Sequence, residues 1–272
     1  AVGRDLASAP VYSETVRFAP VRPPVPPTVA QSARVPLTLR NPHPTPAQRW
    51  LVRSGIPFPQ GMLGSARQVR LLADGKPMPA DIRETAYWPD YSVKWVMVTF
   101  VADCPAQASV PYELEYGATV QAPVWDGADL AQSDGRTKDV VVDTGAARFR
   151  VTPQGELLLA DGKPVRTHIR PSAGAAMATG AIPAAVTICE NGRQYAQVKS
   201  SVAFAGADGV PALTVMMRYE FWAGSPFVKL SHSFLVQGTA PQSDVEEISL
   251  DIPFAGQGWQ AELNDGKSVE LK

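Results

Sequence analysis

The sequence predicts an all-β protein built from two antiparallel β domains that follow an extended, proline-rich arm. From Arg34 onward, short runs of alternating apolar and polar residues succeed one another, and this period of two is typical of half-buried strands. At 272 residues the chain exceeds one ordinary domain, which favours two units. Asp-Gly pairs between such runs indicate tight hairpin turns, and they occur at 74–75, 126–127, 134–135, 161–162, 208–209 and 265–266.

Composition excludes several classes of function. The 25 Lys and Arg residues balance 26 Asp and Glu residues, so the net charge of -1 offers little attraction for nucleic acid. No apolar run approaches the roughly 18 residues that cross a bilayer, so no membrane insertion is expected. Cys104, Cys189 and three histidines are too few and too scattered for a disulfide framework or a metal centre. We therefore expect two free thiols, no metal and no cofactor.

The N-terminal arm is expected to span residues 1–33. Five prolines between Pro20 and Pro27 favour the polyproline II conformation and resist regular strand pairing. Apolar side chains at Tyr12 and Phe18 could pack on the body of the chain or on a neighbouring copy, and a plain linker is the alternative. Any homo-oligomer is expected to form through this arm.

The β domains are expected at 34–118 and 139–272, and the turn-rich stretch 119–138 is interpreted as the linker between them. The Ala/Gly-rich stretch 172–185 is interpreted as a long loop. The expected strands are 35–40, 67–73, 81–87, 93–102, 110–116, 139–143, 146–152, 156–160, 195–205, 212–222, 227–237 and 246–254.

One hairpin can be specified residue by residue. A four-residue loop at 223–226 places Glu220 opposite Lys229, because antiparallel partners keep a constant index sum. The face that carries Glu220 and Trp222 is expected to be polar and wet. The other face is apolar and includes His232, which we interpret as a core histidine rather than a catalytic base.

Aromatic and charged residues cluster around one Pro-Asp turn and form the candidate carbohydrate-binding site. Flat aromatic rings beside charged groups suit the apolar C–H face and hydroxyl rim of a sugar. Ordinary core packing is the alternative interpretation. The candidate residues are Tyr87, Trp88, Tyr91, Lys94 and Arg83. No catalytic residue is assigned, because adjacent acids such as Glu246 and Glu247 point to opposite faces of a strand and cannot flank one bond.

Four stretches together resemble a known family. They are Ser54–Leu63 (SGIPFPQGML), Trp88–Trp95 (WPDYSVKW), Val142–Val151 (VDTGAARFRV) and Tyr219–Phe234 (YEFWAGSPFVKLSHSF). Their order is similar to that in the N-terminal region of exo-acting rhamnogalacturonan lyases and their bacterial relatives, over residues of about 35 to 254. The resemblance implies a small RIFT-type β-barrel at 34–118 and an antiparallel β-sandwich at 139–272. A helical α/α toroid follows in the family, and no such region precedes Lys272.

The resemblance implies a carbohydrate-active protein that is secreted, periplasmic or at the cell surface. Because the family's catalytic cleft is expected to depend on the toroid, lyase activity is not carried over to any residue here. We therefore expect a non-catalytic β-domain region that positions or binds polysaccharide. One alternative is a structural subunit of an extracellular fibre or sheath assembled through the arm. The second alternative is a stand-alone polysaccharide lyase.

Overall fold

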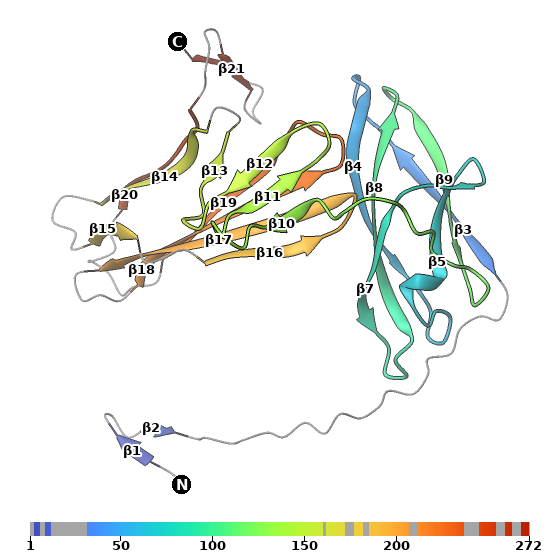
Figure 1. The fold of residues 1–272 in the computed structure, drawn as a ribbon. Coiled ribbons are helices and arrows are strands. Elements are labelled where there is room, and N and C mark those ends of the chain that lie inside the picture. Colours follow the sequence, from blue (N-terminus) through green and yellow to red (C-terminus); the bar gives the residue numbers. More distant parts are fainter. Residues whose placement is uncertain are drawn as a thin grey trace.

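The computed structural model describes residues 32–159, 162–171, 177–181, 185–206, 211–236 and 245–253, and four short outlying strands. Those strands pair as β1 (Gly3–Asp5) with β2 (Ala9–Val11), and as β21 (Trp259–Glu262) with β22 (Ser268–Leu271). The described residues contain no α-helix, and their one helical element is the 3-10 turn η1 (Ala66–Gln68). The all-β prediction is confirmed. Figure 1 shows an N-terminal barrel beside a C-terminal sandwich.

The N-terminal barrel consists of two small antiparallel sheets with strand orders β3-β9-β5-β6 and β4-β8-β7. Side chains from both sheets meet in one core, in which Val69, Val96 and Leu114 are fully buried. The strands are β3 (Ala33–Arg40), β4 (Ala47–Pro57), β5 (Val69–Ala73), β6 (Lys76–Pro77), β7 (Asp81–Tyr87), β8 (Val93–Cys104) and β9 (Ser109–Tyr116).

Local sequence explains much of this barrel. Residues of β3 alternate strictly between partly buried and exposed, as the period-two pattern predicts. Asp74 and Gly75 have φ values of 50° and 72°, and two successive positive φ angles characterise the type I′ turn that joins β5 to β6. The Asp-Gly turn expected at 74–75 is therefore confirmed.

Strand β4 was not expected from the sequence. Its pairing with β8 shifts register between Ala47 and Trp50, which is the mark of a β-bulge. Arg49 in that bulge has a φ of 47°. The extra residue breaks the alternation on which strand prediction depends, and the nearby prolines weaken the pattern further.

The C-terminal sandwich packs a sheet of order β10-β11-β12-β13-β14-β20 against a second sheet of β15, β16, β17, β18 and β19. Their shared core includes Val142 and Val151 from the first sheet and Tyr219 and Phe221 from the second. The strands are β10 (Ala131–Ser133), β11 (Val140–Asp143), β12 (Arg148–Val151), β13 (Leu157–Leu158), β14 (Pro164–Pro171), β15 (Met177–Ala181), β16 (Ala185–Asn191), β17 (Tyr195–Gly206), β18 (Pro211–Trp222), β19 (Lys229–Val236) and β20 (Val245–Asp251).

Several expectations for these segments need correction. The stretch 119–138 contains β10, which pairs with β11, so the first sheet of the sandwich begins inside the expected linker. The stretch 172–185 contains β15 and the first residue of β16, so the interpretation as one long loop is wrong there. Residues 172–176 and 182–184 lie outside the described residues, as does the arm apart from β1, β2 and its last two residues.

The β18–β19 hairpin has the register that the sequence predicts, with Glu220 opposite Lys229 and Met217 opposite His232. The expected wet face is wrong at Glu220 and Trp222, which are 8% and 6% exposed, because the barrel covers them. His232 is partly buried, and a ring nitrogen lies 3.3 Å from the Thr167 hydroxyl. Burial lowers the pKa of His232, as for a histidine packed in a core.

Cys104 is buried and Cys189 is exposed, and both are free thiols, which confirms the cysteine prediction. Among the helical residues that the structure describes, no segment has the length and apolar character needed to span a membrane.

A buried glutamate ties three strands of the barrel together. Glu115 on β9 accepts hydrogen bonds from Arg34 Nε on β3, at 3.1 Å, and from Arg70 Nε on β5, at 2.5 Å. Burial alone would raise the pKa of Glu115, but the hydrogen bonds from Arg70 and Arg34 outweigh it and hold the pKa below the usual 4.5. The ionised carboxylate therefore stabilises the barrel.

Glu115→Gln is expected to make the chain less sensitive to acid. A carboxyl whose pKa is depressed on folding contributes stability above its unfolded-state pKa and loses it as the pH falls through the lower, folded-state value. The melting temperature of the unaltered chain should fall as the pH drops below 4.5, whereas Glu115→Gln should start lower at pH 7 and decline less. Parallel melting curves for the two chains between about pH 7 and pH 3 would contradict this role.

Candidate functional site

Four of the five residues in the candidate carbohydrate site lie together at the tip of the β7–β8 hairpin. Tyr87 and Tyr91 are 55% and 46% exposed. Trp88 is partly buried, and its Nε1 donates to the Phe58 carbonyl at 2.9 Å. The ammonium of Lys94 lies 4.4 Å from the centre of the Trp88 ring. Two aromatic rings at this tip therefore remain open to solvent, and a third supports the turn.

The turn at this tip explains the WPDYS motif. Asp90 Oδ1 accepts hydrogen bonds from the backbone and the hydroxyl of Ser92, and the hydroxyl oxygen accepts from Gly61 N–H. The bond from the Ser92 hydroxyl is the main cause that lowers the pKa of Asp90. Tyr91 has a φ of 62°, a left-handed conformation that residues with bulky side chains seldom adopt.

Arg83, the fifth candidate, does not join this cluster. Its Nε and Nη2 donate to the two carboxylate oxygens of Glu190 at 2.9 and 3.0 Å. Glu190 lies on β16, so Arg83 connects the barrel to the sandwich. The structure therefore separates Arg83 from the aromatic rings and places it in a contact between the two domains.

Asp81 makes the most concentrated link between the domains. Its carboxylate accepts the backbone N–H groups of Arg193, Gln194 and Tyr195 at 3.1, 2.7 and 3.1 Å. These donors end the β16–β17 turn and begin β17. A Cβ on Gly192 would overlap the Asp81 carboxylate, so the turn needs glycine at this position. Burial raises the pKa of Asp81 despite the three backbone hydrogen bonds, which lower it.

Arg53 on β4 extends the contact beside Arg83. Its Nη2 donates to both oxygens of Glu190, at 2.9 and 2.7 Å. Arg53 and Arg83 therefore bind the same carboxylate. Its guanidinium carbon lies 4.0 Å from the centre of the Tyr195 ring, a cation–π contact. The buried Arg53 Nε has no hydrogen-bond partner among the described atoms. Arg53 is thus held by two contacts, its stacking on Tyr195 and its ion pair with Glu190.

Glu220 continues this network into the sandwich. It accepts the Tyr195 hydroxyl at 2.7 Å and pairs with Lys229 Nζ at 2.9 Å. Burial alone would raise the pKa of Glu220, but the hydrogen bonds from Lys229 and Tyr195 outweigh it and lower the pKa. Burial and the bond to Glu220 raise the pKa of Tyr195 well above its usual value. At neutral pH the network therefore holds an ionised glutamate and a neutral tyrosine.

The β4 bulge makes a second contact with the sandwich. Arg49 Nε donates to the Gly224 carbonyl at 3.0 Å, and the Arg49 carbonyl accepts Trp222 Nε1 at 3.0 Å. Trp222 also packs edge-on against Trp50, with ring centres 6.1 Å apart. Gly224 has a φ of 67°, and a Cβ there would collide with the Arg49 guanidinium. The close approach therefore requires glycine at 224.

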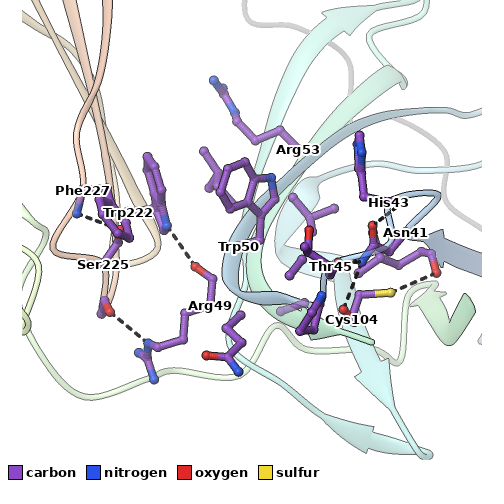
Figure 2. A pocket seen from close by; sticks show the side chains of 18 of the residues that line it. Asn41, His43, Thr45, Arg49, Trp50, Arg53, Cys104, Trp222, Ser225 and Phe227 are labelled. Carbon is purple, nitrogen blue, oxygen red and sulfur yellow. Dashed lines mark hydrogen bonds between the residues drawn. The ribbon is translucent and has the colours of Figure 1, made fainter. Parts of the chain in front are cut away.

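A groove of about 920 Å³ opens beside this contact, and we call it the interdomain groove. Figure 2 shows Trp50 and Arg53 from the barrel opposite Trp222 and Phe227 from the sandwich. Trp50 and Phe227 are 58% and 68% exposed, although both line the groove. Its walls include the segments 39–43, 45–53 and 224–227, together with Trp222. Exposed aromatic surface and cationic side chains thus share one concave site.

The interdomain groove was not expected from the sequence. The unexpected strand β4 carries Arg49, Trp50 and Arg53. The hydrogen-bond partners of Arg49 and Arg53 are between 137 and 175 residues away in the chain. The Trp50-Leu51-Val52 run could have indicated a strand, but no local pattern pairs it with the sandwich. Among the described residues, no group of three or more His, Cys, Asp or Glu side chains could hold a metal ion.

Comparison with known families identifies the barrel. Residues 37–115 match the family model described as the PcRGLX-like N-terminal RIFT barrel domain. Residues 37–115 of this chain therefore form a RIFT barrel domain similar to that one. The match confirms the resemblance that the sequence motifs indicate for this region, and it spans the strands from β3 to β9 that carry Arg53, Asp81 and Arg83.

Two solved structures also resemble the chain. One is titled the crystal structure of an alpha-mannosidase from Enterococcus faecalis V583, with 11% identity and a TM-score of 0.43, over 73% of this chain and 29% of that one. The other is a protein in the Glycosyl Hydrolase Family 38 from Enterococcus faecalis, with 12% identity and a TM-score of 0.45, over 72% and 30%. The chain spans less than a third of either structure. The curated proteins contain no match.

Asp81→Ala is expected to lower the free energy of unfolding by about 2 kcal/mol, because it leaves three backbone N–H groups without their acceptor. Asp81→Asn should lower it less, since one amide oxygen can still accept from Gln194 and Tyr195. Urea denaturation of the three chains measures these differences. An unchanged midpoint for Asp81→Ala would contradict the role given to this carboxylate.

Gly224→Ala is expected to weaken the contact between the domains by about 3 kcal/mol, because left-handed strain adds to a collision with Arg49. Gly145→Ala is the matched control, since Gly145 has a φ of 80° but a Cβ added there would meet no other atom within 4 Å. It should show the strain alone, about 1 kcal/mol. Equal losses of stability, measured by thermal unfolding, would show that the close approach of Arg49 does not matter.

Proposed function

We propose that this chain is the non-catalytic β-domain region of a secreted, periplasmic or cell-surface carbohydrate-active protein, and that it binds and positions polysaccharide. The RIFT barrel links it to a carbohydrate-active family. The sandwich fixes the barrel in place through the contacts of Asp81, Arg53 and Arg49. The two domains thereby form one platform for a long ligand.

One observation carries this proposal. The glutamates at the contact between the domains are paired with other side chains, while several aromatic rings are exposed at the surface. Glu190 and Glu220 accept hydrogen bonds from arginine, tyrosine and lysine. A general acid or base must instead face substrate with a pKa suited to proton transfer. Exposed rings offer the flat apolar surfaces that sugars contact, and Trp50 and Tyr87 are both more than half exposed.

Two surfaces of the described residues could meet the ligand. One is the hairpin tip with Tyr87, Trp88, Tyr91 and Lys94, and the other is the interdomain groove. Both consist of aromatic rings beside cationic groups. The tip is a projecting turn, whereas the interdomain groove is concave and contacts a ligand from two sides.

The purified chain is expected to bind polysaccharide without cleaving it. Affinity electrophoresis against a panel of neutral and acidic polysaccharides should show retardation by at least one of them. Absorbance of unsaturated ends and reducing-sugar release should stay at the level of a heat-denatured sample. Retardation by none of the panel would contradict binding, and turnover abolished by a point substitution would support the stand-alone lyase instead.

Deletion of residues 1–33 tests the alternative of an assembling subunit. If the chain is a carbohydrate-binding region, the deletion should leave polysaccharide retardation and the melting temperature within error of the full chain. Static light scattering of both forms reports any assembly. Large particles that vanish with the arm, in a chain that binds no polysaccharide, would favour a fibre or sheath subunit.

A further inference from the structure

We propose that the sandwich forms a symmetric dimer in which strand β19 pairs with β19 of a second copy of the chain. The pairing surface is the free side of residues 229–236, which we call the β19 edge. Among the described residues β19 hydrogen-bonds to β18 alone, so the other side of the strand has no neighbour. This inference does not depend on the proposed polysaccharide binding, and the dimer does not use the N-terminal arm.

The β19 edge is regular and open to solvent. An edge strand presents unpaired backbone N–H and C=O groups along its free side, and these groups can pair with another strand. The pairing of β19 with β18 runs over all eight residues of β19 without a register shift. Phe234, Leu235 and Val236 are 56%, 49% and 53% exposed, so the described residues leave the second half of the strand uncovered.

The other edge strands of the sandwich carry features that discourage such pairing. Strand β20 bears three acidic side chains, and β10 is only three residues long. Strands β15 and β16 each show a register shift where they pair with β17. Charges, short strands and bulges are common means by which proteins protect a sheet edge. The β19 edge has none of them after Lys229, because residues 230–236 contain no aspartate, glutamate, lysine, arginine or proline.

The sequence of the β19 edge is complementary to itself. In an antiparallel pair related by a two-fold axis, the numbers of facing residues have a constant sum. With the axis at Ser233, Leu230 faces Val236 of the second copy, and His232 faces Phe234 of the second copy. Apolar and aromatic cross-strand pairs of this kind stabilise antiparallel sheets, and no charged side chain lies opposite another residue. A second copy of the chain is therefore the partner that this edge fits.

The dimer would also extend the sandwich core. Leu230 packs against that core, and Phe234 lies on the same face of the sheet because side chains alternate along a strand. In the two-fold pairing this face of one copy continues into the same face of the other. The apolar surface that Phe234 exposes in a single copy thereby gains a covering neighbour.

The pairing is expected to be weak and to stop at two copies. Contact through one strand from each copy is expected to bury less than the roughly 1,200 Å² of a standard protein–protein interface, and small interfaces are typical of transient complexes. Dimers should therefore form near about 100 µM and dissociate near about 1 µM. Because each copy uses its one β19 edge in a closed two-fold contact, no larger assembly should form through it.

Sedimentation velocity of the full chain over this concentration range tests the dimer. Ser233→Lys places two ammonium groups opposite each other at the axis and should weaken dimerisation about fivefold or more. Ser233→Glu should do the same, and an equimolar mixture of the two variants should form dimers again, because opposite charges then face each other. Thr187→Lys is the matched control, since Thr187 is exposed on β16 on the opposite side of the same sheet. It should dimerise like the unaltered chain.

Leu235→Lys is a second variant at the edge. It places an ammonium group at two symmetric positions of the dimer, each facing Ser231, and should weaken dimerisation about tenfold. Deletion of residues 1–33 should leave the dimer intact. Because Ser233 and Leu235 are exposed, the variants should keep the melting temperature of the unaltered chain under conditions where both are monomeric, so that any loss of dimers reflects the edge and not unfolding.

Four results would overturn the inference. They are an unaltered chain that stays monomeric at about 100 µM, dimers that survive both lysine substitutions at the edge, dimers that disappear with the arm, and a mixture of Ser233→Lys and Ser233→Glu that does not associate. Masses above that of two chains, lost in Ser233→Lys, would contradict the closed two-fold contact. None of these results bears on polysaccharide retardation, so the proposed function is tested separately.

Discussion

A carboxylate from one domain closes a backbone turn of the other, and the arrangement of the molecule depends on that contact. Asp81 starts β7 in the barrel and accepts three N–H groups where β17 begins in the sandwich. The same turn is fixed to β10, because Leu130 N–H donates to the Gly192 carbonyl and Asn191 exchanges two hydrogen bonds with Ala131. One turn thus connects the barrel, the first strand of the sandwich and the opposite sheet. Backbone hydrogen bonds are directional, so this contact orients the domains as well as joining them.

Three arginines of the barrel make the other contacts between the domains. Arg53 and Arg83 approach Glu190 from two barrel strands, and Arg49 reaches the β18–β19 turn. A buried ion pair gains little net stability, since desolvation offsets the attraction, but breaking it is costly. Such contacts therefore favour one orientation over others more than they add to stability. The interdomain groove exists only in that orientation, because its walls come from both domains.

The sequence predicts the strands well where the pattern is local. Strand β7 matches its expected bounds of 81–87, and the β18–β19 register follows from the 223–226 loop. The pattern fails where residues far away in the chain determine the regularity of a strand or the burial of a side chain. Strand β4 carries a bulge that contacts the sandwich, and Glu220 is buried on the face of its sheet that meets Arg53 of the barrel. In the candidate carbohydrate site Tyr87 and Tyr91 are exposed, whereas Arg83 forms an ion pair with Glu190 of the sandwich. The interdomain groove is a product of tertiary contact, so no local period could indicate it.

We expect the barrel and the sandwich to unfold as one structural unit. Differential scanning calorimetry of the full chain distinguishes one unfolding unit from two, because it compares the calorimetric enthalpy with the van't Hoff enthalpy of the same transition. One transition is expected, in which the two enthalpies agree, since the contacts of Asp81, Arg49 and Arg53 must break together with both cores. Two resolved transitions, one for the barrel and one for the sandwich, would contradict it.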